Sequence, residues 1–305
     1  MTAAPPLSTA AGAAPEGPPP PEPRFRLLGR MSPVAWWSSR GAAADWVFIS
    51  LLVIMTLVAV AAPWLAPHDP VQPVGAPRQP WFSDGHLLGT DMLGRDLLSR
   101  TLMGLRTSWL LAMIVTVVGL IIGMTVGLVA GMHGGWVDTV LMRFTEVFLA
   151  LPSMIVAVAV AAALGPGLTN TFIAVTIVWW PYYARIIRSE VRALAVRPHV
   201  EAARMAGVGW FRIMWRHLLP GTVPTAIVTA SLDIGNVVLV LATLSFLGLG
   251  QPAPAPELGA DTSRGMAEIL NAWWVPVIPG ACVALLSLIS NLAGDGVRNR
   301  LANRS

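Results

Sequence analysis

Long apolar runs separated by polar connections dominate the chain. Six runs each hold the roughly 17 to 25 mostly apolar residues that a helix needs to cross a hydrocarbon layer, the longer ones at a tilt. The pattern therefore predicts an all-α integral membrane protein with six transmembrane helices in a domain of residues 46–298. The runs lie at 46–66, 107–131, 138–163, 170–187, 222–249 and 274–293.

The composition indicates that lipid is the main solvent. Apolar residues of the set AVILMFWYC make up 55% of the chain and charged residues 12%, against about 25% charged in an ordinary soluble domain. The 20 basic residues are all arginines, and the absence of lysine excludes a Walker A phosphate loop or a Schiff base. The single cysteine, Cys282, excludes an intrachain disulfide.

The arginines indicate how the spans are oriented. With the N-terminus in the cytoplasm, fifteen arginines fall inside and five outside, as the positive-inside bias requires. Six spans then place both termini in the cytoplasm. We expect a proline-rich, basic and disordered tail at 1–45 and a second cytoplasmic tail at 299–305. The outer arginines are Arg78, Arg95, Arg100, Arg106 and Arg264.

The inner connection at about 188–221 predicts a helix-turn-helix. Pro198 suits the first turn of a helix, which good helix formers continue over 199–206. Glycines break it at 207–209. An amphipathic helix over 210–218 follows, and Pro220 is predicted to stop it.

The first of these two helices is small on one face. Ala202, Ala203 and Gly207 would let it seat in a groove of a soluble partner, with Glu201 and Arg204 at the rim. A membrane-surface anchor would need only the second helix. The segment therefore predicts contact with a protein on the cytoplasmic side.

The spacing in this segment resembles the EAA loop of ABC importer permeases. Glu201-Ala202-Ala203 is followed three residues later by Gly207, and nine residues after that by His217-Leu218-Leu219-Pro220. The family often has isoleucine where this chain has His217. The resemblance implies a type I importer permease-like fold whose coupling helices dock on ATP-hydrolysing subunits. The positions to which it assigns that contact are Glu201, Ala202, Ala203, Arg204, Gly207, His217, Leu219 and Pro220.

Three further segments resemble the C-type permease subunit of dipeptide, oligopeptide and nickel importers. HLLGTDMLGRDLLSR at 86–100 is similar to the signature HPLGTDxxGRDxxSR, with Leu87 in place of proline. LSFLGLG at 244–250 and NLAGDGVR at 291–298 resemble two later segments, the second departing at Asn299, where an acid is usual. The resemblance covers the whole predicted spanning domain.

This resemblance implies a non-catalytic subunit of the bacterial inner membrane that forms half of a translocation pathway for peptides. It also implies a second permease subunit in a heterodimer, two ATPase subunits that bind ATP and Mg²⁺, an extracytoplasmic solute-binding protein and surrounding lipid. We expect no cofactor or metal on this chain and no nucleic acid partner. A nickel chelate or another small solute is the alternative cargo; peptide is favoured because metal-binding spacing is absent.

Two features inside the predicted spans require partners. Glycines four residues apart in the second span let another helix approach closely, and we favour packing within the subunit over a subunit interface. In the fifth span, Asp233 lies beside Ser231 and Asn236. It faces either a polar translocation path or a satisfied structural environment. The glycines are Gly119, Gly123, Gly127 and Gly131.

The outer segment at about 67–106 holds Asp91, Arg95 and Asp96. We favour local pairing of these residues in a compact cap over the helix ends; the alternative is direct contact with the substrate.

Two other classes of function remain alternatives. A membrane-embedded hydrolase would need a nucleophile or metal constellation, and neither HExxH nor GxSxG occurs. An ion-coupled carrier would show internal repeats and several intramembrane acids.

Overall fold

The structure, a computed structural model, describes residues 42–83 and 85–302. The disorder predicted for 1–45 lies outside these residues, except for the last four positions, which begin the first described helix. The described chain is helical. In order the helices are α2 (Ala42–Leu65), α3 (Leu97–His133), α4 (Gly135–Leu149), α5 (Ser153–Leu164), α6 (Leu168–Ala195), α7 (Pro198–Met205), α8 (Trp210–Ile213), the π-helical turn η1 (Met214–Leu218), α9 (Leu219–Phe246), α10 (Leu258–Gly265), the short η2 (Met266–Glu268) and α11 (Trp274–Ala302).

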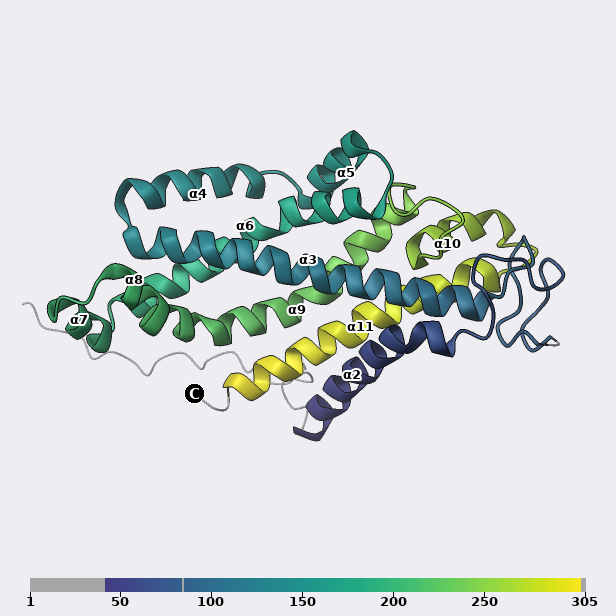
Figure 1. Cartoon of the computed structure of the whole chain (residues 1–305), viewed down its shortest axis with the longest axis horizontal. Helices are drawn as coiled ribbons and strands as arrows, with labels where there is room; N and C mark the ends of the chain where they lie inside the picture. Colours follow the sequence, from purple (N-terminus) through teal and green to yellow (C-terminus); the bar gives the residue numbers. More distant parts are fainter. Residues whose placement is uncertain (1–41, 84, 303–305) are drawn as a thin grey trace, which may run out of the picture. The chain divides into compact units, whose positions relative to one another are not determined.

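The long helices lie side by side in a bundle (Figure 1). α3 packs along α6, and α11 packs against both α9 and α2. Buried side chains such as Trp109, Val175, Leu241 and Leu286 fill the space between them. Helices α7 and α8 lie at one end of this bundle, and α10 lies at the other with residues 66–83 and 85–96, which we call the cap segment.

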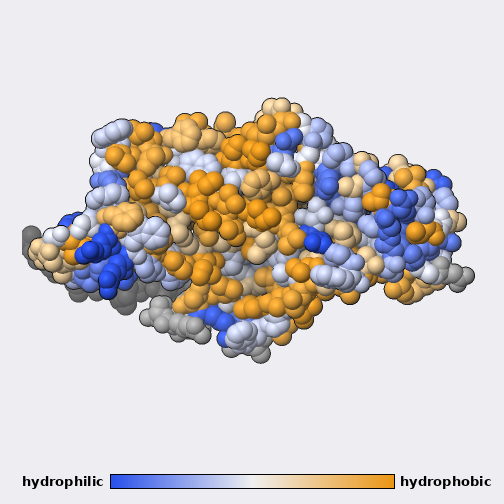
Figure 2. Space-filling model, in the orientation of Figure 1, coloured by the Kyte–Doolittle hydropathy of each residue, from blue (hydrophilic) through white to orange (hydrophobic). Residues whose placement is uncertain are grey.

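The surface of the bundle is apolar between two polar ends. Figure 2 shows orange, hydrophobic residues over the middle of the long helices and blue, hydrophilic residues at both ends. On α2, Val53, Ile54 and Leu57 are exposed. Large contiguous apolar surfaces of this kind are covered by lipid or by another protein, as expected for a chain that crosses a membrane.

Among the described residues, four helices are long and apolar enough to cross a membrane: α2, α3, the continuous stretch Trp210–Phe246, and α11. Helices α4 and α5 pass that test only as a bent pair. α6 has 28 residues but does not pass, since its centre at 179–183 reads Trp-Trp-Pro-Tyr-Tyr. The count of six spans therefore stays a prediction, while four or five follow from length and composition.

The third predicted span, 138–163, is not one straight helix. α4 and α5 meet at an angle of 85°. Pro152 lies between them with φ −57° and ψ 118°. A proline has no backbone N–H to donate and disfavours helical geometry in the residue before it, here Leu151. The chain consequently leaves the helix at Ala150 and starts a new one at Ser153.

The second predicted span begins earlier than expected. α3 starts at Leu97 and not near residue 107, because Asp96 caps it. The Asp96 carboxylate accepts a hydrogen bond from the Ser99 backbone N–H at 2.8 Å, which satisfies one of the free donors at a helix start. The 37 residues of α3 extend about 55 Å, well beyond a hydrocarbon layer of about 30 Å.

Pro220 does not stop the second helix of the inner connection. The chain passes from α8 through the π-helical turn at 214–218 directly into α9. A proline inside an α-helix clashes with the carbonyl four residues before it, here that of Arg216. The turn just before Pro220 is instead π-helical, with the Leu219 N–H donating to the Met214 carbonyl five residues earlier, and the helix continues through Pro220.

Candidate functional site

The coupling segment, predicted at about 198–218 and followed by the predicted contact positions Leu219 and Pro220, begins with α7 and a glycine turn. Gly207 has φ +76°, a left-handed conformation that strains other residues. Its N–H donates to the Arg204 carbonyl at 3.1 Å, and the Val208 N–H donates to the Ala203 carbonyl at 3.1 Å. These two bonds form a Schellman motif. Gly207 therefore ends α7 and turns the chain toward α8.

Three buried side chains hold the coupling segment against the bundle. Val200, Ile213 and Leu218 join a hydrophobic cluster with Ile187 and Leu194 of α6. Much of α7 is otherwise open: Glu201, Ala202 and Arg204 are exposed, as is Gly207 just beyond its end, and Ala203 is half-buried. Most of the predicted contact positions in this part of the segment are thus left uncovered by the described part of the chain.

The second half of the coupling segment presents aromatic rings. Trp210, Phe211 and Trp215 are each more than half exposed and lie ring against ring, with centroids 5.7 and 6.0 Å apart. Farther along, His217 and Leu219 are half-buried and Pro220 is exposed. Exposed aromatic clusters of this kind suit a headgroup layer or a protein partner.

Asp233 lies on α9 and is only 8% exposed. Its carboxylate accepts hydrogen bonds from Trp179 Nε1, from the Tyr183 hydroxyl at 2.8 Å and from Asn236 Nδ2 at 3.4 Å. Two of these donors come from α6 and had no signal in the local sequence around Asp233. The carboxylate therefore has the partners that an intramembrane acid needs.

Asp233 also borders a cavity of about 410 Å³ at the bend between α4 and α5. This volume is within the range of small-molecule sites. Its wall combines aromatic rings and apolar side chains with a few polar groups, and the cavity is partly open. The lining residues are Phe148, Leu149, Leu151, Ser153, Val178, Trp179, Tyr182, Asp233 and Asn236.

The four-residue glycine row of α3 faces α6 of the same chain. A Cβ added at Gly123 would lie 2.6 Å from the Trp180 carbonyl oxygen, and one at Gly127 would lie 2.6 Å from that of Ala184. At Gly131 the nearest atom would be Val191 Cβ at 2.8 Å, whereas at Gly119 nothing would be closer than 3.5 Å. The row therefore lets the two helix backbones approach closely.

The cap segment is held by buried ion pairs. Arg95 Nε donates to the Asp91 carboxylate at 2.6 Å, so this predicted pair is present. Asp96 instead caps α3. Arg100, 1% exposed, donates to the Pro70 carbonyl at 2.8 Å and to the Asp261 carboxylate at 2.5 Å. It thereby ties the cap segment, α3 and α10 together, a role that sequence reasoning did not assign.

Two acids near the cap have shifted pKa values. Burial raises the pKa of Glu257, and hydrogen bonds from Ser245 and the Gln251 backbone N–H oppose that shift only partly. Burial also acts to raise the pKa of Asp96, but hydrogen bonds from Ser99 and His86 outweigh it, so that this pKa lies below its usual range. Asp96 is thus an anion held by several donors.

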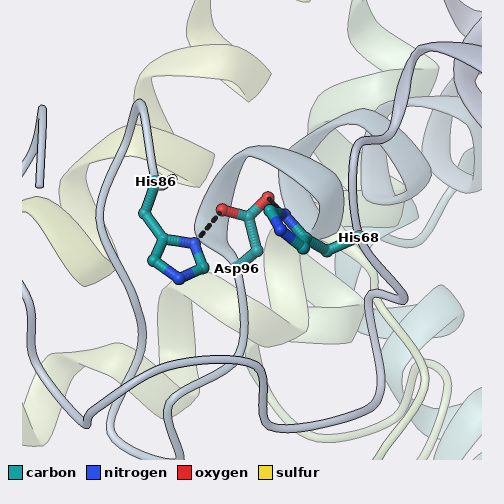
Figure 3. A group of neighbouring side chains, drawn as sticks. All are labelled: His68, His86 and Asp96. Carbon is teal, nitrogen blue, oxygen red and sulfur yellow. Dashed lines mark hydrogen bonds and ion pairs between the residues drawn. The ribbon is translucent and has the colours of Figure 1, made fainter. Parts of the chain in front are cut away.

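Sequence reasoning also missed a cluster of His68, His86 and Asp96 in the cap (Figure 3). We expected no metal on this chain because no ligand spacing typical of a metal site occurs. The three residues are far apart along the chain and meet only through the fold of the cap segment. The 86–100 motif contained the signal for His86 and Asp96, but nothing in it pointed to His68.

Comparisons with known proteins agree with this architecture. Residues 123–304 match the family described as "Binding-protein-dependent transport system inner membrane component". The "Probable D,D-dipeptide transport system permease protein DdpC" of Escherichia coli K12 is 38% identical over 266 residues, 87% of this chain and 89% of that protein. The "Di/tripeptide transport system permease protein DppC" of Pseudomonas aeruginosa UCBPP-PA14 is 41% identical over 276 residues, 87% of this chain and 90% of that protein.

A solved structure shares the fold. A chain of the MetNI methionine ABC transporter, in an inward-facing conformation, superposes with a TM-score of 0.53 at 20% identity, covering 65% of this chain and 94% of that one. The helical bundle is thus of the ABC importer permease type. The chain belongs to the family of binding-protein-dependent transport system inner membrane components.

Proposed function

We propose that this chain is one of two permease subunits of an ATP-driven importer that carries short peptides across the bacterial inner membrane, with both termini in the cytoplasm. The observation that carries the proposal is the 38 and 41% identity to permeases of D,D-dipeptide and di/tripeptide systems over 87% of the chain. A partner permease in a heterodimer would supply the other half of the pathway, and an extracytoplasmic solute-binding protein would deliver the peptide.

The coupling segment would transfer the free energy of ATP. The chain has no lysine and hence no Walker A loop, so ATP and Mg²⁺ would bind to two separate ATPase subunits. The exposed face of α7, with Glu201, Ala202 and Arg204, would seat in a groove of one such subunit. Movement of that subunit would then be transmitted to the long helices, and no chemistry would take place on this chain.

The cavity beside Asp233 is the candidate for this chain's share of the pathway. It has one carboxylate, amide and hydroxyl groups, and aromatic walls, a combination that suits a peptide's charged amino end and its apolar side chains. Because the carboxylate keeps three donors, it would bind cargo weakly. Weak binding is what transport requires.

A single charge reversal tests the coupling role. Glu201→Lys places a cation on the exposed face of α7 and should lower uptake of radiolabelled dialanine at least tenfold in cells that also express the partner subunits. The amount of protein in the membrane should not change, because Glu201 makes no contact that the fold needs. Capture of the ATPase subunit through this chain should fall in parallel.

Glu190→Lys is the matched control, since it makes the same charge change on α6 near the same end of the bundle but outside the coupling segment. It should leave both measurements near those of the parent. Normal uptake and ATPase capture by the Glu201→Lys variant would contradict the coupling role. If the parent chain captures the ATPase subunit but the cells do not take up dialanine, the proposed peptide cargo would be contradicted instead.

A further inference from the structure

Three side chains with metal-ligating atoms meet in the cap, at the N-terminal end of α3. One ligand atom each of His68, His86 and Asp96 lies within 4.8 Å of the others. His86 Nδ1 is 2.9 Å from Asp96 Oδ1, and His68 Nδ1 is 3.8 Å from Asp96 Oδ2. Figure 3 shows the two imidazole rings on either side of the carboxylate.

We propose that these residues bind one divalent transition metal ion, with Zn²⁺ the best fit. Zinc binds imidazole nitrogen and carboxylate oxygen at about 2.0 to 2.2 Å in tetrahedral geometry, which places two ligand atoms about 3.3 Å apart. His86 Nδ1 lies 2.9 Å from Asp96 Oδ1 and His68 Nδ1 lies 3.8 Å from Asp96 Oδ2, one separation shorter and one longer than that value and each to a different carboxylate oxygen. Two nitrogen ligands disfavour Ca²⁺ and Mg²⁺, which prefer oxygen.

Unsatisfied polar atoms around the cluster support an ion site. His68 Nδ1 is buried and makes no hydrogen bond within the described part of the chain. The same holds for the side-chain oxygen of Gln79. Buried polar atoms without protein partners are uncommon in folded chains, and those that occur often contact a bound ion or water. An ion at Nδ1 would satisfy His68 directly.

Gln79 would be satisfied through His86. Metal binding at His86 Nδ1 moves the ring proton to Nε2, where metal-bound histidines usually donate to an oxygen. Gly75 leaves space beside both atoms: a Cβ there would lie 2.6 Å from Gln79 Oε1 and 2.7 Å from His86 Nε2. The proton on His86 Nε2 would therefore lie in the same region as Gln79 Oε1, an acceptor that has no hydrogen bond.

The surroundings hold the three ligands in place. Asp96 Oδ2 accepts hydrogen bonds from the Ser99 N–H at 2.8 Å and from Ser99 Oγ at 2.6 Å. The His68 backbone N–H donates to the same Ser99 Oγ at 3.1 Å. The His68 side chain is 32% exposed, which gives an ion a way in and leaves a fourth position for water. The ion would link three positions of the cap that are far apart in the sequence.

Zinc binding to the purified full-length chain tests the proposal. After treatment with a chelator and its removal, titration calorimetry with ZnCl₂ should show one tight site, and zinc should raise the unfolding temperature. His68→Asn should weaken that site at least roughly tenfold. The variant should fold without metal as the parent does, because His68 Nδ1 makes no hydrogen bond. His86→Asn should weaken zinc binding equally.

A second histidine pair provides the control. His199 and His217 in the coupling segment have ring centroids 6.1 Å apart and could bind zinc adventitiously. The double variant His199→Asn, His217→Asn should keep the tight site. Three results would overturn the proposal: no tight site, a site lost in this double variant, or one unchanged in His68→Asn. Since no transport is measured, these outcomes are separate from those that test the proposed function.

Discussion

At the scale of single residues, two glycines of the coupling segment differ in what they require of the backbone. Gly207 has φ +76° and Gly209 has φ −59°. Neither has an atom within 4 Å of the position where a Cβ would lie. An added side chain would therefore have open space at both positions. Only the left-handed backbone conformation at Gly207 disfavours a residue other than glycine.

Gly207→Ala should strain the end of α7 by about 1 to 2 kcal/mol and lower peptide uptake, whereas Gly209→Ala should resemble the parent. Gly207→Asn should lie between them, because asparagine tolerates the left-handed region. Hydrogen exchange of the amides at 203–208 measures the strain directly. Equal exchange in the two alanine variants would show that the turn does not depend on Gly207.

Glu257 gives a pH-dependent prediction. Because burial raises its pKa in the folded state, the folded chain is favoured at low pH, and that advantage is lost as the pH rises through the raised pKa. Glu257→Gln keeps both hydrogen-bond partners, Ser245 and the Gln251 N–H, without the buried charge. The unfolding temperature of Glu257→Gln minus that of the parent should therefore increase as the pH is raised from 4.5, the ordinary pKa of glutamate, to neutral.

Glu268→Gln is the control with the opposite sign. A hydrogen bond from Arg78 lowers the pKa of Glu268, so its contribution to stability is present above the ordinary value and lost as the pH falls through the lowered pKa. The effect should be small because the Arg78 side chain is about half exposed to solvent. A parallel pH trend in the two variants would contradict the assigned cause.

At the scale of elements, α3 and α6 are a closely packed helix pair. Gly127→Ala should force the backbones apart, because its Cβ would lie 2.6 Å from the Ala184 carbonyl oxygen. The expected loss is about 1 to 3 kcal/mol, as for other overpacked sites. Gly119→Ala, whose Cβ would meet nothing closer than 3.5 Å, should be neutral. Thermal unfolding in detergent compares the two, and equal losses would contradict close packing as the cause.

The length of the apolar runs alone predicted the long helices that contain few polar residues, such as α2 and α11. It failed where one local feature overrides hydropathy. Pro152 bends the third run, the Asp96 cap lengthens α3, and the π turn carries α9 through Pro220. Such features depend on backbone hydrogen bonds that an apolar pattern does not record.

The features of the candidate site also differ in whether the sequence could predict them. The turn at Gly207 follows from neighbours in sequence, so spacing predicted it. The donors to Asp233 come from Trp179 and Tyr183 on another helix, and His68 approaches Asp96 only through the fold of the cap. Contacts between distant segments have no local signal, which is why sequence reasoning missed them.

At the scale of the whole molecule, the two polar ends should lie on opposite sides of a membrane. Leu270 is 95% exposed near α10, and Met205 is 84% exposed in α7. Single cysteines can be introduced in a Cys282→Ala background and treated with a membrane-impermeant maleimide. In intact cells whose outer membrane has been removed, Leu270→Cys should be labelled and Met205→Cys should not; inside-out vesicles should give the reverse. Labelling of Met205→Cys in the intact cells would contradict a cytoplasmic coupling segment.

The π-helical turn makes the aromatic tip of the coupling segment and the carboxylate of Asp233 parts of one uninterrupted rod. Trp210–Phe246 comprises 37 residues, about 55 Å of helix, and the π turn and the prolines near its start are the places where it can bend. A displacement of Trp210 would therefore be transmitted along one continuous helix to the wall of the cavity at the bend of α4 and α5.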